Sequence, residues 1–314
     1  MEVIAVVGAT GFLGRHLINS LALRADFQIR ALSRKPMPTE KPRVHWFTGD
    51  LLAPHTFAAL VEPQCTVVNL AHLGNGSLQD NISAVSNLAE LCRKEKIRRF
   101  VHCSTATVVG QVSDTVITEN MMCDPATEYE ATKLAIERTL INKAEKAFEL
   151  AILRPTAIFG PGGKNLLKLA HGLSRGQRVA NFAKSCLFDR RKMNLVYVDN
   201  VVAAIEFLLD TTSEVDGEVF IVSDDGHPWN NYRDIETKLM ASFGISDYGA
   251  PRFPLHPLIL SIALKLLNKS NVNPHRIYVD EKLRRLGFAK PVSFEIGLAL
   301  FANWYETEVL AKQQ

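Results

Sequence analysis

The sequence predicts an α/β fold, a doubly wound parallel sheet with a smaller second α/β part. Three observations carry this prediction: short apolar runs alternate with helical segments over the first half, a glycine-rich turn follows the first run, and the alternation breaks into loop after residue 155. Such alternation is typical of βα units, whose parallel strands are covered by helices on both faces. Because single cores stop growing near about 250 to 300 residues, the 314 residues suggest two domains. We expect a dinucleotide-binding domain at 1–160 and a substrate-binding part at 161–314, with some later chain returning to the first sheet.

Six β-rich runs bounded by turn or polar residues predict the strands of the sheet. They are residues 3–7, 28–32, 43–48, 66–70, 99–103 and 149–153. Helices are expected between them, most clearly at 77–96 and 129–146. The second half has further strands near 194–198 and 218–222 and a helical tail from about residue 230. Right-handed crossovers then place a ligand crevice at the carboxyl ends of the strands.

Composition excludes several classes of protein. The 36 basic and 33 acidic residues give a net charge of only +3, without the basic stripe that nucleic-acid binding requires, so we expect a small-molecule partner. The five cysteines lack any CxxC pair, which indicates reduced thiols and a cytoplasmic location rather than disulfides or zinc. The nine histidines lack HxH or HxxxH spacing, so no metal site is expected.

One apolar segment, residues 254–267, raises the question of membrane contact. It is too short to span a bilayer, and it contains a proline and a lysine near its end. We therefore expect a buried or partly exposed helix and no transmembrane segment, with monotopic membrane contact as the weaker alternative.

The first strand runs directly into Gly8-Ala9-Thr10-Gly11-Phe12-Leu13-Gly14, which is followed by an apolar helical stretch. Glycines let the backbone turn off the strand and approach a pyrophosphate, while free N–H groups and the helix dipole attract the anion. The GxxGxxG spacing after a strand predicts a Rossmann-type dinucleotide site. A tight turn without a ligand is the alternative.

The end of the second strand selects the dinucleotide, because a carboxylate there binds the 2′-hydroxyl of NAD and an arginine accommodates the 2′-phosphate of NADP. This strand ends in Ser33-Arg34-Lys35 and offers no carboxylate, which favours NADP over NAD. Solvated surface charge is the other interpretation of Arg34. Asp50 and Leu51, after the third strand, are placed to meet the adenine, although Asp50 could instead cap a helix beginning near Pro54.

Tyr129 and Lys133 stand four residues apart and so share one face of a helix. A nearby cation lowers the pKa of a phenol, which predicts an acid–base tyrosine tuned by Lys133, with the lysine also holding the nicotinamide ribose. Ser104 and Thr105 end the fifth strand and face the same crevice, where a hydroxyl can bind a substrate carbonyl oxygen. They could also simply satisfy backbone groups there. His72 and His102 lie near the crevice in sequence and are interpreted as satisfied core histidines.

With the glycine turn and six further motifs, the chain resembles an extended short-chain dehydrogenase/reductase of the NAD-dependent epimerase/dehydratase superfamily. The six motifs are GDL at Gly49, NLA at Asn69, STATVVG at Ser104, YEATK at Tyr129, LRPTAIFGPGG at Leu153 and VDNV at Val198. The resemblance implies that Tyr129 is the acid–base, Lys133 its partner, and Thr105, or Ser104 beside it, the ligand of the reacting oxygen. It also implies cofactor contacts from Leu70, Ala71 and Pro155, a place for Asn81 near the nicotinamide where it contacts the substrate, and a homodimer through 77–96 and 129–146.

Two substrate classes compete within this resemblance. The tail is similar to the 3β-hydroxysteroid dehydrogenase-like branch, which acts on apolar alcohols. The basic run Arg190-Arg191-Lys192 instead suits a nucleotide-sugar diphosphate, although Met193 stands where sugar-nucleotide enzymes commonly have an arginine. Because Arg34 favours an exchangeable NADP, the sequence predicts a reductase of a 4-keto nucleotide sugar or similar ketone. An NAD-dependent epimerase or dehydratase, an apolar-alcohol dehydrogenase and a non-catalytic dinucleotide sensor are the alternatives.

Overall fold

A computed structural model describes residues 1–38, 41–253, 257–266 and 272–312. The chain forms two compact units, which are described separately. Unit 1 comprises residues 1–108, 127–154 and 202–220, and unit 2 comprises 109–126, 155–201 and 221–314. The domain boundary that the sequence places at residue 160 stays a prediction.

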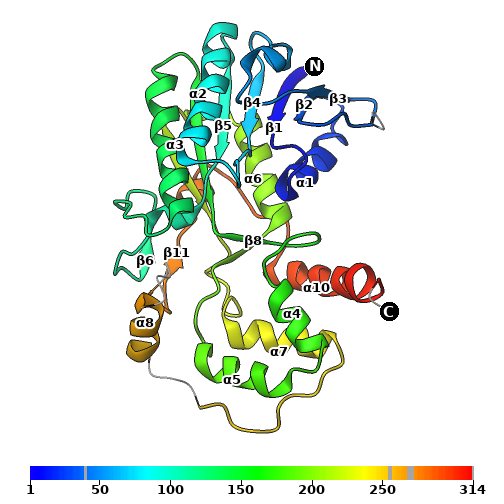
Figure 1. Cartoon of the computed structure of the whole chain (residues 1–314), viewed down its shortest axis with the longest axis vertical. Coiled ribbons are helices and arrows are strands. Elements are labelled where there is room, and N and C mark those ends of the chain that lie inside the picture. Colours follow the sequence, from blue (N-terminus) through cyan, green and yellow to red (C-terminus); the bar gives the residue numbers. More distant parts are fainter. Residues whose placement is uncertain (39–40, 254–256, 267–271, 313–314) are drawn as a thin grey trace. The chain divides into compact units, whose positions relative to one another are not determined.

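A seven-stranded sheet is built from β1 (Glu2–Val7), β2 (Phe27–Ser33), β3 (Val44–Thr48), β4 (Thr66–Asn69), β5 (Arg99–Cys103), β7 (Glu149–Pro155) and β10 (Glu218–Val222). Its order is β10-β7-β5-β4-β1-β2-β3, and the pairs from β7 to β3 are parallel (Figure 1). From β1 the chain continues to β2 and β3 on one side of β1 and then crosses to β4 on the other side of β1. The direction in which successive strands are added to the sheet therefore reverses between β1 and β4. The predicted doubly wound sheet is confirmed, and that reversal is where such sheets bind ligands.

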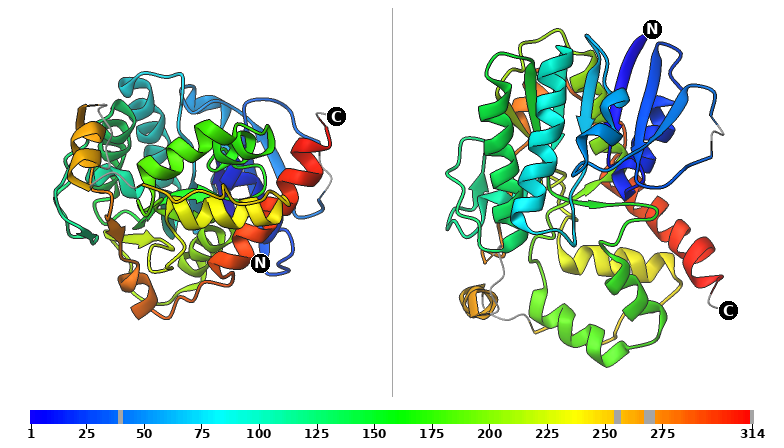
Figure 2. Two further views of the ribbon diagram at one scale, coloured as in Figure 1. Left: turned by 90° about the horizontal axis from the view of Figure 1, so that it is seen from below. Right: turned by 45° about the horizontal axis from the view of Figure 1, so that its top comes forward.

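Helices α2 (Leu78–Glu95) and α3 (Glu128–Ala144) run side by side against one face of the sheet (Figures 1 and 2). Their apolar side chains join alternate residues of β1, β4, β5 and β7 in one buried cluster, as the two-residue period of a strand requires. Each helix begins with a capping box, Ser77 with Asp80 and Thr127 with Glu130. These caps fix where the two helices start, and so fix the height of Tyr129 on α3.

The remaining elements of unit 1 are α1 (Phe12–Leu21), η1 (Pro54–Thr56), η2 (Ala58–Leu60), and most of η3 (Ala106–Val109) and α6 (Val198–Asp210). Helix α1 buries Leu17, Ile18 and Leu21. Asp50 does not cap the helix at Pro54: the cap position is Ala53, and the Asp50 carboxylate accepts the Leu52 N–H at 2.9 Å instead. The capping alternative for Asp50 is therefore wrong.

Unit 2 contains two small parallel sheets, β6 (Val116–Ile117) with β11 (Ile277–Tyr278), and β8 (Ala157–Phe159) with β9 (Leu195–Tyr197). Its helices are α4 (Leu167–Ser174), α5 (Arg178–Phe188), α7 (Tyr232–Ser242), α8 (Pro257–Leu266), α9 (Glu281–Arg285), α10 (Phe294–Trp304) and the π-helix Tyr305–Leu310. Phe159 packs edge-on against both Tyr197 and Phe294 in its core.

Helix α8 corresponds to most of the apolar segment predicted at 254–267; residues 254–256 and 267 lie outside the described residues. Leu260 and Leu264 are buried, whereas Ile259 and Ile262 are exposed, so the prediction of a partly exposed helix is confirmed. None of the helices in the described part of the chain combines the length and the apolar character needed to cross a membrane.

Candidate active site

The turn after β1 is shaped so that only glycine fits at two of its positions. Gly8 has a φ of +79°, and a Cβ there would lie 2.7 Å from the carbonyl carbon of Leu70. A Cβ on Gly14 would lie 2.2 Å from the oxygen of Gly8. Both distances are far below van der Waals contact. The turn therefore packs against the end of β4 and folds onto the start of α1.

The first turn of α1 differs from those of α2 and α3. Its N-cap is Gly11, which offers no side-chain cap, and no acidic residue stands in its first turn. The first four N–H groups of a helix have no partner inside the helix, and together with the helix dipole they attract an anion. The glycine cradle and this helix start, formed by Gly8, Gly11 and Gly14 around Thr10, Phe12 and Leu13, fit a dinucleotide pyrophosphate.

A cavity of about 240 Å³ opens over this turn at the reversal of the sheet order. It brings together most of the residues predicted to bind cofactor: Gly8, Thr10, Gly11, Ser33, Arg34, Asp50, Leu51, Leu70 and Ala71. His72 and Leu73 line it as well. The lining residues do not include five others predicted to contact cofactor, which are Phe12, Leu13, Gly14, Lys133 and Pro155. Pro155 is the last residue of β7.

The rim of the cavity carries the residues that would select the dinucleotide. Arg34 is exposed and follows directly on Ser33, the last residue of β2. The Ser33 hydroxyl accepts the backbone N–H of Lys35 at 3.2 Å, which tightens the chain at this point. A cation and a hydroxyl thus stand at the end of β2.

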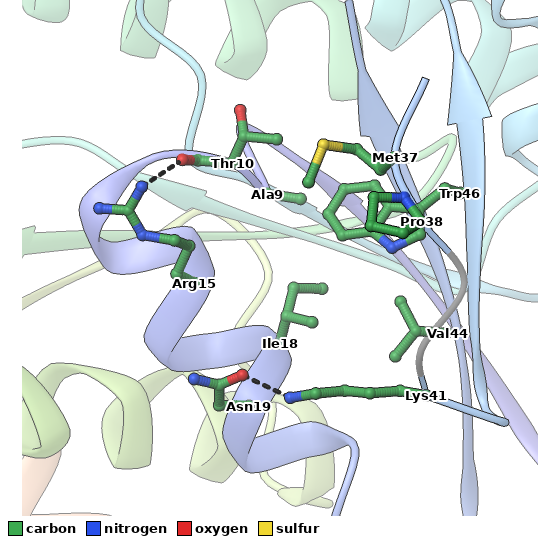
Figure 3. Close-up of a pocket in the computed structure, with 10 residues that line it drawn as sticks. All are labelled: Ala9, Thr10, Arg15, Ile18, Asn19, Met37, Pro38, Lys41, Val44 and Trp46. Carbon is green, nitrogen blue, oxygen red and sulfur yellow. Dashed lines mark hydrogen bonds between the residues drawn. The ribbon is translucent and has the colours of Figure 1, made fainter. Parts of the chain in front are cut away.

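A second cavity, of about 360 Å³, lies between α1 and β3 and borders the same turn through Ala9 and Thr10 (Figure 3). The Arg15 guanidinium reaches back from the first turn of α1 and donates to the oxygen of Thr10 at 3.3 Å. The Lys41 ammonium reaches Asn19 across the cavity. Arg15 adds a positive charge beside the glycine turn that our sequence reasoning missed, although a basic residue directly after the third glycine was a visible signal.

The predicted catalytic hydroxyls meet at the end of β5. Thr105 and Tyr129 share a side-chain hydrogen bond, and the Thr105 oxygen also lies 3.1 Å from that of Thr107. Ser104 is buried, and its hydroxyl has no hydrogen-bond partner in the described part of the chain. Of the two hydroxyls, that of Thr105 is therefore the one that interacts with Tyr129, and the catalytic role of both residues stays a prediction.

Lys133 is buried one helical turn beyond Tyr129, and its ammonium donates to the carbonyl oxygen of Cys103 at 3.0 Å. Burial lowers the pKa of Lys133 and raises the pKa of Cys103 to about 11. Glu137, one turn further along α3, pairs with Arg154 at 2.6 Å, and both side chains are buried. These contacts fix the catalytic face of α3 against the ends of β5 and β7.

The predicted lowering of the Tyr129 pKa by Lys133 is wrong. Although 45% of the residue is exposed, desolvation of the phenol raises the pKa of Tyr129 to about 12, and the hydrogen bond with Thr105 only partly opposes this. Spacing on a helix places two side chains on one face, but it does not report how deeply a phenol is desolvated.

The interpretation of the two histidines as core residues holds for His102, which is fully buried, and is wrong for His72. His102 is fully buried and neither ring nitrogen has a hydrogen-bond partner among the described residues; burial holds its pKa well below the usual range. His72 is only half-buried and packs edge-on against the Tyr129 ring at 5.1 Å. It is a site residue that no sequence motif indicated.

Asn81 uses its side chain to hold the loop between β4 and α2. Its oxygen accepts the N–H of Leu73 at 2.9 Å, and its amide donates to the oxygens of Leu73 and Ser77 at 3.2 and 3.0 Å. It is buried, so the structure gives it a role in loop geometry. Direct substrate contact by Asn81 stays a prediction.

The basic run in unit 2 has partners within that unit. Arg190 is exposed and forms an ion pair with Asp234 at 3.8 Å, and the Arg191 guanidinium lies 5.7 Å from the centre of the Phe188 ring. Lys192 donates to the oxygen of Asp225 at 3.2 Å. Each of the three cations thus has a contact within unit 2.

The glycine turn leads into a helix without a side-chain cap, at the point where the strand order of the parallel sheet reverses. A Tyr–Thr pair and a buried lysine lie on the same edge of the sheet. This combination defines a Rossmann-type dinucleotide-dependent oxidoreductase. The profile of the NAD dependent epimerase/dehydratase family matches residues 4–223. The chain therefore belongs to this family, and it is an enzyme of the extended short-chain dehydrogenase/reductase type.

Similar proteins of known sequence include two classes of enzyme. The chain is 23% identical over 353 aligned positions to a decarboxylating sterol-4-alpha-carboxylate 3-dehydrogenase of Candida albicans, covering 98% of this chain and 99% of that protein. It is 28% identical over 240 positions to a UDP-glucose 4-epimerase of Vibrio cholerae, covering 71% of each.

Among solved structures, the chain resembles a dTDP-glucose 4,6-dehydratase from Bacillus anthracis in complex with NAD. The TM-score is 0.74 at 17% identity, covering 99% of this chain and 98% of that chain. A UDP-glucuronic acid 4-epimerase from Bacillus cereus gives a TM-score of 0.72 at 20% identity, covering 98% and 99%. These likenesses establish the fold.

Proposed function

We propose that this enzyme interconverts a secondary alcohol and a ketone, with NADP(H) as the exchangeable hydride carrier. The observation that carries the proposal is the hydrogen-bonded pair of Tyr129 and Thr105, beside a cavity that leads from the glycine turn to His72. A nicotinamide dinucleotide, when bound, supplies or accepts the hydride at the carbon of the reacting group. The protein's own task is then to manage the proton on the oxygen.

Tyr129 and Thr105 divide that task. In the reductive direction the Tyr129 hydroxyl donates its proton to the carbonyl oxygen, and in the oxidative direction its oxygen accepts the proton of the alcohol. The Thr105 hydroxyl hydrogen-bonds the same oxygen, so that charge developing there is stabilised by a donor already in place. A pKa of about 12 keeps Tyr129 protonated at neutral pH and so favours its use as an acid.

NADP is the proposed dinucleotide because of the charges at the end of β2. Arg34 offers an exposed guanidinium at the cavity rim, Ser33 a hydroxyl, and Arg15 a second cation beside Thr10. Guanidinium groups bind phosphate with paired hydrogen bonds. The family and the solved structures with NAD support a nicotinamide dinucleotide, and these residues support the 2′-phosphorylated form.

For the substrate, we propose an apolar cyclic alcohol rather than the nucleotide sugar that the basic run suggested. Arg190, Arg191 and Lys192 each have a contact within unit 2, so the choice rests on the relatives rather than on this basic run. The sterol dehydrogenase relative aligns along nearly the whole chain. A nucleotide sugar remains the second candidate, supported by the epimerase relative.

The test is a pair of initial-rate assays on the purified enzyme. One offers 3β-hydroxysteroids and the other UDP-glucose and dTDP-glucose, each with NADP⁺ and with NAD⁺, while reduced nicotinamide is followed at 340 nm. Oxidation of a hydroxysteroid that Tyr129→Phe abolishes would support the proposal. Conversion of a nucleotide sugar without net release of reduced dinucleotide would replace it with the epimerase alternative.

Two further proposals concern the whole protein. We propose a homodimer that pairs through α2 and α3, where Leu78 and Ile141 are exposed apolar side chains; sedimentation velocity of the wild type and Ile141→Glu tests it. Five free cysteines fit a reducing compartment such as the cytoplasm.

A further inference from the structure

We propose that His72 is a positioning residue for Tyr129: its uncharged ring fixes the plane of the phenol and so the direction of the reactive hydroxyl. This inference rests on the proposed role of Tyr129 and deepens it. It assigns a task to a residue in the loop between β4 and α2, far in sequence from every other member of the candidate catalytic group.

The contact between the two rings has the geometry that aromatic pairs prefer. The ring centroids of His72 and Tyr129 lie 5.1 Å apart with an interplanar angle of 88°. Edge-to-face pairs at such separations are favourable beyond the apolar area they bury. Because Tyr129 stands in the exposed first turn of α3, this ring and the hydrogen bond with Thr105 constrain it from two directions.

The loop that carries His72 is itself held on both sides. Before it, the Asn69 side-chain oxygen accepts the N–H of Ala71 at 3.0 Å. After it, Asn81 binds both the N–H and the oxygen of Leu73. A residue anchored at both neighbouring positions has little freedom to move away from Tyr129. Asn81 therefore acts on the site through Leu73 and His72.

The surroundings of His72 keep it uncharged. Burial and the charge of Lys133 lower the pKa of His72, against a smaller opposite effect from Asn81. Its Nδ1 is buried without a hydrogen-bond partner among the described residues. The cavities that it lines also contain Arg34, Asp50 and Asp80. An uncharged ring orients the phenol without adding charge beside it.

The experiment compares His72→Ala, which removes the ring, with His72→Phe, which keeps a ring of similar shape but no nitrogen. His55→Ala is the matched control, because His55 is exposed on η1 away from this contact. All proteins are labelled with 3-fluorotyrosine, and the Tyr129 resonance among the six tyrosines is identified by its absence in Tyr129→Phe. Fluorine spectra, dinucleotide affinity and kcat with the best alcohol are then measured.

We expect His72→Ala to shift the Tyr129 resonance and to lower kcat roughly 10- to 100-fold, the cost of a misplaced catalytic group; kcat is measured at saturating dinucleotide because His72 also lines the cofactor cavity. His72→Phe should restore most of kcat and leave its pH profile unchanged, and His55→Ala should match the wild type. A wild-type resonance and kcat in His72→Ala would overturn the proposal, as would a His72→Phe enzyme as slow as His72→Ala. If the wild type oxidises none of the alcohols, the proposed function fails, while the fluorine spectra still decide whether His72 orders Tyr129.

Discussion

Replacing Gly14 with alanine should cost dinucleotide affinity and, through strain in the turn, some fold stability. The added Cβ would lie 2.2 Å from the Gly8 oxygen and 2.7 Å from the carbonyl carbon and oxygen of Ala9, all of them backbone atoms. Relief of this clash requires the turn to open by about 1 Å. Because charge-assisted hydrogen bonds contribute about 1.5 to 3 kcal/mol each, loss of one N–H contact to a phosphate weakens binding by roughly 10- to 150-fold.

Gly226→Ala is the matched control for this change. Gly226 has no positive φ, and a Cβ there would meet nothing within 4 Å. Isothermal titration of both variants with NADPH and NADH gives the two affinities, and thermal unfolding gives the stability of each variant. In the unfolding experiment, the better helix propensity of alanine contributes about 1 kcal/mol and so offsets part of the strain that the new Cβ causes in α1. A folded Gly14→Ala protein that binds dinucleotide as tightly as Gly226→Ala would refute the assignment of this turn as the phosphate site.

Three more predictions follow from the site and from unit 2. Tyr129→Phe should lower kcat by about 10²- to 10⁴-fold without weakening NADPH binding. We expect alcohol oxidation by the wild type to rise as pH approaches the Tyr129 pKa of about 12, and Tyr129→Phe should abolish this rise. Arg34→Ser should weaken NADPH roughly 10-fold or more, the scale of a lost charge-assisted hydrogen bond, and leave NADH unchanged, as fluorescence titration would show. Burial raises the pKa of Asp225 from 3.8 to about 7, so the folded protein holds this proton more tightly than the unfolded chain does. The resulting contribution to the free energy of unfolding is full below about pH 4 and is lost as pH rises through 7. The thermal unfolding midpoint should therefore be higher at about pH 5.5 than at about pH 8, and Asp225→Asn should show a smaller difference.

The sheet was predictable because its signals are local. A buried parallel strand shows itself as a short apolar run, and the turn after β1 shows itself by three glycines. For the strand Glu218–Val222, only the bounds could be predicted from the sequence. Its position in the sheet, beside β7, is visible only in the folded chain.

The candidate site was only partly predictable, since several of its properties depend on residues distant in sequence. The pairs Arg190 with Asp234 and Lys192 with Asp225 join residues tens of positions apart, and they change the meaning of a basic run. Likewise, the Tyr129 pKa depends on desolvation that helical spacing cannot report. His72 belongs to no motif and gains its role only where the β4–α2 loop meets α3.

The most direct test of the central claim, an exchangeable NADP-linked oxidoreductase, is a titration of the purified protein with NADPH and with NADH. Bound nicotinamide fluorescence gives both affinities, and analysis of the protein as purified shows whether any dinucleotide is retained. We predict that NADPH binds more tightly than NADH and that both are removed by dialysis. Tightly retained NAD, with no preference for NADPH, would contradict the role of Arg34 and indicate an enzyme that returns the hydride to its own substrate, as an epimerase does.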